Sequence, residues 1–129
     1  MKVLLIDDEV NQRNAVKQLL RSFCPLVQTI EEAGSVQSGL QAVQHFQPDL
    51  VFLDVEIGDG TGFDLMREIK NPGFQLVFIT AHNKYAITAF QYSAIDYLLK
   101  PVDPSELKRA VDRAAGHIKN SSLREQLQV

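Results

Sequence analysis

The sequence predicts an α/β fold, in which a parallel β-sheet carries helices on both faces. Apolar runs of strand length recur along the chain, at residues 3–6, 27–30, 50–53, 76–79 and 94–99. Between and after them lie segments whose apolar residues recur at helical spacing. A strand–helix unit repeated five times implies parallel strands joined by right-handed crossovers. The chain of 129 residues is long enough for one such domain.

The predicted strands differ in how deeply they should be buried. Residues 3–6, 50–53 and 76–79 are nearly continuous in Val, Leu, Ile and Phe, which is typical of strands covered on both faces. Residues 27–32 alternate more between apolar and polar side chains. This alternation favours a position nearer the edge of the sheet.

Four helices are predicted by clear apolar stripes, and a fifth by a weaker one between Tyr85 and Tyr92. The clear stripes are Ala15, Val16, Leu19, Leu20 and Phe23; Val36, Leu40, Val43 and Phe46; Phe63, Leu65, Met66 and Ile69; and Leu107, Ala110, Val111, Ala114 and Ile118. Ser35 should cap the second helix, and Asp103 should cap the last one, with Pro104 as its first residue. Residues 71–73, Asn-Pro-Gly, predict a turn.

Composition narrows the class of protein without indicating its chemistry. Hydrophobic residues make up 45% of the chain and charged residues 22%, as in a soluble globular protein. No apolar run is long enough for a membrane span, so we expect no membrane association. The single cysteine, Cys24, excludes an internal disulfide and fits a cytoplasmic location. The net charge of −3 gives no sign of nucleic-acid binding by charge.

The periodic pattern ends near residue 118. We therefore expect a domain over residues 1–118, and residues 119–129 to be frayed helix or the beginning of a linker. Residues 119–122, Lys-Asn-Ser-Ser, are polar.

Polar and charged side chains follow four of the predicted strands. Asp7 and Asp8 follow the first strand, and Asp54, Thr80 and Lys100 follow the third, fourth and fifth. The carboxyl ends of parallel strands meet at one edge of the sheet, where α/β proteins bind ligands. Each residue alone has an ordinary explanation, such as a helix cap for an aspartate or a solvated surface charge for the lysine. Their coincidence at one edge favours a common site.

Three carboxylates at one edge repel one another, and a hard divalent cation relieves that repulsion. Mg²⁺ suits such a site, and Mn²⁺ could take its place. The cation would also hold a phosphoryl group in line with a carboxylate nucleophile, for which Asp54 is the candidate. Lys100 would pair with a phosphoryl oxygen, and Thr80 would donate a hydrogen bond to another.

The sequence resembles the receiver domain of bacterial two-component response regulators over residues 1–118. The matching motifs are Leu4-Leu5-Ile6-Asp7-Asp8-Glu9, Val51-Phe52-Leu53-Asp54, Gly62-Phe63, Phe78-Ile79-Thr80-Ala81 and Asp96-Tyr97-Leu98-Leu99-Lys100-Pro101. The resemblance implies a flavodoxin-like, doubly wound parallel (βα)5 sheet with strand order 2-1-3-4-5. It also implies a signalling switch that catalyses only its own phosphorylation and dephosphorylation, with a sensor histidine kinase as phosphoryl donor.

The resemblance assigns a role to each residue at the phosphorylation site. Asp54 matches the phosphorylated aspartate, and Asp8 the direct metal ligand. Asp7 matches the carboxylate that acts on the metal through water. Glu56 matches the position whose backbone carbonyl binds the metal.

Further roles belong to the switching machinery. Thr80 matches the switch hydroxyl and Lys100 the phosphate-binding lysine. Tyr97 matches an aromatic residue that changes rotamer on activation, although packing on the final helix is the ordinary explanation for such a residue. The peptide bond before Pro101 is expected to be cis. The responding surface would be the fourth helix, fifth strand and fifth helix, roughly residues 84–117, through which the phosphorylated protein would form a homodimer.

One departure from the family concerns the loop after Asp54. Many members have Met-Pro where this chain has Ile57-Gly58, and glycine should make the loop less rigid. Glu56 and His82 flank the site at positions where the family varies.

Residues 78–102 narrow the resemblance to receivers joined to a LytTR-type DNA-binding domain. That domain would lie beyond residue 129, so we expect any DNA binding to belong to it and not to this acidic domain.

Three other interpretations remain open at this point. A phosphatase of the haloacid dehalogenase type would carry its aspartates as Asp-x-Asp after the first strand, whereas Asp7 and Asp8 are adjacent here. A pseudo-receiver would share the fold without taking phosphate. A free-standing receiver would act through protein contacts alone.

Overall fold

The computed structural model describes residues 1–127, which fold around one five-stranded parallel sheet. Its strands are β1 (Lys2–Ile6), β2 (Thr29–Ala33), β3 (Leu50–Leu53), β6 (Gln75–Thr80) and β7 (Asp96–Leu99). They lie side by side in the order β2-β1-β3-β6-β7. Because β6 and β7 are the fourth and fifth predicted strands, this is the predicted 2-1-3-4-5 order of a doubly wound, flavodoxin-like sheet.

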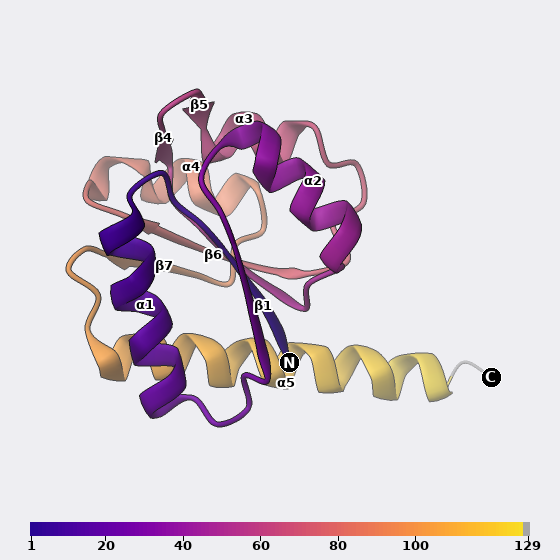
Figure 1. The fold of residues 1–129 in the computed structure, drawn as a ribbon. Coiled ribbons are helices and arrows are strands. Elements are labelled where there is room, and N and C mark those ends of the chain that lie inside the picture. Colours follow the sequence, from indigo (N-terminus) through magenta and orange to yellow (C-terminus); the bar gives the residue numbers. More distant parts are fainter. Residues whose placement is uncertain (128–129) are drawn as a thin grey trace.

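The helices cover both faces of the sheet (Figure 1). They are α1 (Val10–Phe23), α2 (Val36–Phe46), α3 (Gly62–Arg67), α4 (Ala86–Gln91) and α5 (Pro104–Leu127), with a 3-10 turn, η1 (Asn83–Tyr85), before α4. Buried side chains of α1 and α5 pack on one face of the sheet, and those of α3 and α4 on the other, where α2 also packs. Strands β1 and β3 are covered on both faces, as their continuous apolar sequences predict.

The second strand begins and ends later than predicted, at Thr29–Ala33 instead of residues 27–30. Val27 packs against the core, but its amide bonds back to the carbonyl of Cys24 in a turn. Pairing with β1 then continues through two glutamates to Ala33. Parallel pairing uses the backbone, so polar side chains on an edge strand do not end it. The edge position itself is confirmed.

The predicted helix caps are present. Ser35 forms a capping box with Ser38 at the start of α2. At the start of α5, Asp103 Oδ1 accepts hydrogen bonds from the amides of Ser105 and Glu106, at 2.8 and 3.3 Å. Each cap satisfies amide groups that have no partner within the helix.

A small hairpin that the sequence pattern did not indicate follows β3. It consists of β4 (Glu56–Ile57) and β5 (Gly60–Thr61), which pair antiparallel. Strands of two residues are too short to produce a recognisable alternation. The hairpin contains Ile57 and Gly58, the two residues that stand where many members of the resembled family have Met-Pro.

Helix α5 continues past residue 118, where we expected frayed helix or a linker. Residues 119–127 remain helical and are all exposed, and Lys, Asn and Ser are tolerated on a solvated helix. The last two residues of the expected linker, 128 and 129, lie outside the described part of the chain. The limit of the domain at residue 118 stays a prediction.

No helix within residues 1–127 is long and apolar enough to cross a membrane.

Candidate functional site

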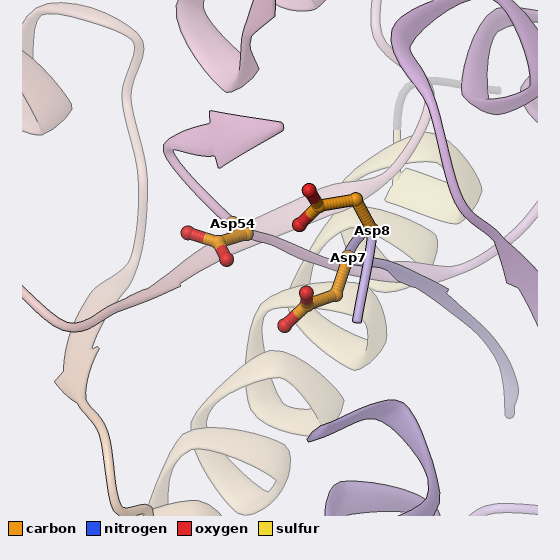
Figure 2. Close-up of side chains that lie close together, drawn as sticks. All are labelled: Asp7, Asp8 and Asp54. Carbon is orange, nitrogen blue, oxygen red and sulfur yellow. The ribbon is translucent and has the colours of Figure 1, made fainter. Parts of the chain in front are cut away.

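The register of the sheet brings the predicted site residues together. Ile6 of β1 pairs with Leu53 of β3, so Asp7 and Asp54 follow neighbouring strands at the same height. The amide of Asp54 donates to the carbonyl of Ile6 at 2.9 Å. One carboxylate oxygen from each of Asp7, Asp8 and Asp54 lies within 4.8 Å of the others. Figure 2 shows these three side chains grouped beyond the strand ends.

Lys100 reaches this cluster from the end of β7. Its amide donates to the carbonyl of Thr80 at 2.9 Å, which keeps the two strand ends together. Its Nζ donates to Asp7 Oδ2 and to Asp54 Oδ2, both at 2.8 Å. Burial alone would lower the pKa of Lys100, but the hydrogen bonds and charges of Asp54 and Asp7 outweigh burial and raise it. The lysine is therefore a charged bridge between two carboxylates.

Asp54 is the more buried of the two carboxylates that this lysine joins. Its Oδ1 accepts a hydrogen bond from the amide of Glu56 at 3.1 Å. Burial raises the pKa of Asp54; Lys100 and the Glu56 amide oppose that shift, and the charge of Asp7 adds to it. Asp8 differs, because its side chain is exposed.

The predicted switch residues lie beside the carboxylate cluster. Thr80 is fully buried, and its Oγ1 accepts a long hydrogen bond of 3.4 Å from the amide of His82. The Tyr97 hydroxyl donates to the carbonyl of His82. Tyr97 is half-buried against the core layer that contains α3 and α4, so packing on the final helix is the wrong explanation for it. The Lys100–Pro101 peptide bond is cis, the isomer expected at this position.

The sequence placed Glu56 and His82 beside the site, but two contacts there, that of Glu56 with Tyr85 and that of Arg13 with Asp7, were not predicted. Glu56 Oε1 accepts a hydrogen bond from the Tyr85 hydroxyl at 2.9 Å and lies 3.4 Å from His82 Nε2. Arg13 of α1 donates to the main-chain carbonyl of Asp7. No local motif marks either contact: Tyr85 and Glu56 are 29 residues apart, and the six-residue spacing of Arg13 and Asp7 matches no recurring pattern. Only the inward-facing position of Arg13 on an amphipathic helix could have indicated a special role.

The donor set suits a hard divalent cation. Three carboxylates offer oxygens close to one another, and the main-chain carbonyl of Glu56 belongs to the segment directly after Asp54. Oxygen donors with several retained waters are what Mg²⁺ prefers. Asp7, Asp8, Asp54 and the Glu56 carbonyl are the groups that could hold such an ion.

The response regulator receiver domain family matches this chain over residues 3–112. The chain is 37% identical over 116 residues to the sensory transduction protein LytT of Bacillus cereus, covering 88% of this chain and 46% of that protein. It is 36% identical over 124 residues to the sensory transduction protein LytR of Staphylococcus haemolyticus, covering 95% and 48%. The chain thus spans about half the length of these relatives.

Solved structures show the same architecture. The response regulatory domain of MrkE from Klebsiella pneumoniae superposes with a TM-score of 0.83 at 26% identity, covering 93% of this chain and 99% of that one. A response regulator receiver domain protein from Clostridium thermocellum gives a TM-score of 0.80 at 31% identity, covering 92% and 96%.

Proposed function

This chain belongs to the response regulator receiver domain family, and we propose from its site that Asp54 accepts a phosphoryl group in a Mg²⁺-dependent reaction. The donor would be the phosphohistidine of a sensor histidine kinase. The observation that carries the proposal is the buried Asp54 carboxylate, which lies within 4.8 Å of two further carboxylates and is bound by a lysine.

Asp54 would act as the nucleophile. A carboxylate oxygen forms a bond to phosphorus while the phosphorus–nitrogen bond of the phosphohistidine breaks, and the imidazole nitrogen keeps the electron pair. The amide of Glu56 holds Oδ1, which restricts rotation of the carboxylate. When bound, Mg²⁺ supplies the positive charge that neutralises the phosphoryl oxygens.

On phosphorylation, the Lys100 ammonium would exchange its hydrogen bond to the Asp54 carboxylate for one to a phosphoryl oxygen. Its Nζ already lies 2.8 Å from Asp54 Oδ2, within reach of a group attached to that carboxylate. Thr80 would donate its hydroxyl to another phosphoryl oxygen. To reach that oxygen, the Thr80 side chain would move toward Asp54, which would weaken its contact with the His82 amide. His82 lies in the loop to which the Tyr97 hydroxyl is bound.

The output of the switch would be the surface formed by α4, β7 and α5. Ile87 and Phe90 of α4 are 79% and 77% exposed and, three residues apart on one helix, lie on the same face, where an apolar patch indicates an interaction surface. A phosphoryl group adds about −1.5 to −2 charges at a single point and shifts an existing equilibrium between two arrangements of this surface. The favoured arrangement would form a homodimer.

The wider function is transcription regulation through a LytTR-type DNA-binding domain. Support comes from the LytT and LytR relatives, each about twice as long as the segment that this chain matches. The receiver itself has a net charge of −3, so DNA binding would belong to that second domain.

Incubation with acetyl phosphate and Mg²⁺ tests phosphoryl acceptance. Intact-protein mass should show one phosphoryl group on the wild-type chain and none on Asp54→Ala. Asp112→Ala, which removes an exposed carboxylate on α5, should still be phosphorylated. An unmodified wild-type chain, or an adduct undiminished in Asp54→Ala, would contradict the proposal.

A further inference from the structure

Arg13 connects helix α1 to the turn that carries the acidic pair. Its Nη1 donates to the main-chain carbonyl of Asp7 at 2.5 Å. Its Nε pairs with Glu32 Oε1 of β2 at 3.2 Å. Only 15% of the Arg13 side chain is exposed, so the guanidinium is held between the edge strand and the turn. Such a two-sided arrangement uses the planar fork of arginine.

The other polar groups of Asp7 already have partners. Its amide donates to the carbonyl of Ala33 at 3.1 Å, its Oδ1 accepts from the amide of Glu9 at 2.9 Å, and its Oδ2 accepts from Lys100. The bond from Arg13 therefore engages the one remaining main-chain group of Asp7. That carbonyl lies in the planar peptide that joins Asp7 to Asp8. By holding it, Arg13 sets the direction in which the chain enters Asp8.

Asp8 depends on this backbone direction. Its carboxylate is exposed and accepts no hydrogen bond from any residue between 1 and 127, so no side-chain contact of its own orients it. With no hydrogen bond to fix it, the position of its oxygens beside Asp54 depends on the direction of the turn.

Gly34 leaves room for the guanidinium at this contact. A Cβ atom on Gly34 would lie 3.3 Å from Arg13 Nη1 and 3.9 Å from the carbonyl oxygen of Asp7. Burial would raise the pKa of Glu32, but the hydrogen bonds and charges of Lys17 and Arg13 outweigh burial and lower it. Glu32 is thus a charged anchor for the arginine.

We propose that Arg13 is a positioning residue for the metal site, holding the Asp7–Asp8 peptide so that the Asp8 carboxylate is oriented toward Asp54. This inference rests on the proposed Mg²⁺ site. Removing Arg13 should change Mg²⁺ binding in opposite directions, depending on whether the residue acts through its charge or by positioning Asp8. A cation near the site repels Mg²⁺, so removing it should tighten binding if charge is its only effect. If Arg13 positions Asp8, removing it should weaken binding.

Lys17 provides a matched control. It lies one turn further along α1 and pairs with Glu32 Oε2 at 3.0 Å, with 24% of its side chain exposed. It contributes a similar charge to the same carboxylate, and the only hydrogen-bond partner of its side chain among residues 1–127 is Glu32, so its ammonium does not bond to the Asp7 carbonyl.

Calorimetric titration with Mg²⁺ alone, at constant ionic strength, should separate the two effects. We expect Arg13→Met to weaken Mg²⁺ binding by about tenfold, the lower limit for loss of a residue that orients a metal ligand. Arg13→Lys keeps the charge but not the fork, and should also weaken binding. Lys17→Met should leave binding unchanged or slightly tighter. Unchanged or tighter binding in Arg13→Met would overturn the proposal.

Hydrogen exchange of the metal-free protein provides a second readout. The Glu9 amide, which bonds to Asp7 Oδ1, should exchange faster in Arg13→Met and as in wild type in Lys17→Met. Equal exchange in all three proteins would overturn the positioning role. If the wild-type chain binds no Mg²⁺, the metal site of the proposed function fails, while this exchange measurement still tests whether Arg13 orders the turn. If Arg13→Met does not fold, the same two measurements on Arg13→Lys, which keeps the charge but not the fork, test the proposal.

Discussion

At the scale of single residues, the site is organised around one ammonium group between two carboxylates. Lys100 Nζ lies 2.8 Å from an oxygen of Asp7 and 2.8 Å from an oxygen of Asp54. Breaking a buried ion pair leaves an uncompensated charge, which costs more than the intact pair contributes. The lysine and a bound cation would thus share the neutralisation of these carboxylates.

Lys100→Met should therefore make the stability of the fold depend on Mg²⁺. Without metal, we expect a loss of about 3 kcal/mol in the free energy of unfolding, because two carboxylates that face each other lose their shared partner. Saturating Mg²⁺ should restore more stability to the variant than it adds to wild type. Urea unfolding with EDTA and with Mg²⁺ measures both quantities.

Lys108→Met is the control for this comparison, because it removes an exposed lysine paired with Asp112 on α5. It should change neither stability nor the effect of Mg²⁺. Equal stabilisation of wild type and Lys100→Met by Mg²⁺ would argue against shared neutralisation.

At the scale of elements, the segment after Asp54 is held at several points. Asp59 Oδ1 accepts a hydrogen bond from the amide of Val36 at 2.8 Å, which ties the β4–β5 hairpin to the start of α2. Thr61 and Asp64 form a capping box at the start of α3. Gly58 has no left-handed φ, so this structure does not use the backbone freedom that glycine allows. Its small size matters instead, because a Cβ there would lie 3.3 Å from Asp8 Oδ2.

Gly62→Ala should disturb both the fold and the site. A Cβ at Gly62 would lie 2.5 Å from the carbonyl oxygen of Asp54 and 2.9 Å from Leu53 Cγ, so the start of α3 or the end of β3 must move. We expect a loss of about 1–3 kcal/mol in the free energy of unfolding and slower phosphorylation by acetyl phosphate. Denaturant unfolding and mass spectrometry measure these effects.

Gly116→Ala is the matched substitution in open space, since a Cβ there meets no atom within 4 Å. It should stabilise the protein by up to about 1 kcal/mol through the higher helix propensity of alanine. A Gly62→Ala variant as stable and as readily phosphorylated as wild type would show that α3 tolerates displacement.

At the scale of the whole molecule, the sheet separates two apolar layers and carries the site at one edge. The layer formed with α1 and α5 lies on one face, and the layer formed with α2, α3 and α4 lies on the other (Figure 1). The short α4 leaves Ile87 and Phe90 exposed, and the loop before it contains His82, to whose carbonyl Tyr97 is bound. A conformational change at the phosphorylation site would therefore reach the exposed Ile87 and Phe90 through the loop that contains His82.

The double variant Ile87→Ser/Phe90→Ser should weaken dimerisation without destabilising the monomer. With Mg²⁺ and a beryllofluoride mimic of the phosphoryl group, we expect the dimer dissociation constant to rise at least about tenfold, because the apolar area that the proposed dimer would bury is removed. Sedimentation velocity measures it.

The control is Phe23→Ser/Leu26→Ser, which changes two side chains that are 46% and 50% exposed at the end of α1 and in the loop after it. This control should dimerise as wild type does. Unchanged dimerisation of the α4 variant would place the interface elsewhere.

Much of the fold could be predicted because its signals are local. Continuous apolar runs identified β1 and β3, and Ser35 and Asp103 identified the starts of two helices. The start of β2 and the β4–β5 hairpin could not be predicted in this way. The turn at Val27 and the pairing of Glu56 with Thr61 depend on backbone partners that no periodicity encodes.

The sequence by itself determined that Asp7, Asp54 and Lys100 meet, because residues that follow parallel strands must emerge at the same edge of the sheet. Only the tertiary structure decided how they are held. The bonds of Arg13 to Glu32 and of Tyr85 to Glu56 join elements that approach each other only after the helices pack on the sheet. Such contacts depend on distances and directions between elements, whereas a sequence pattern records only the spacing along one chain.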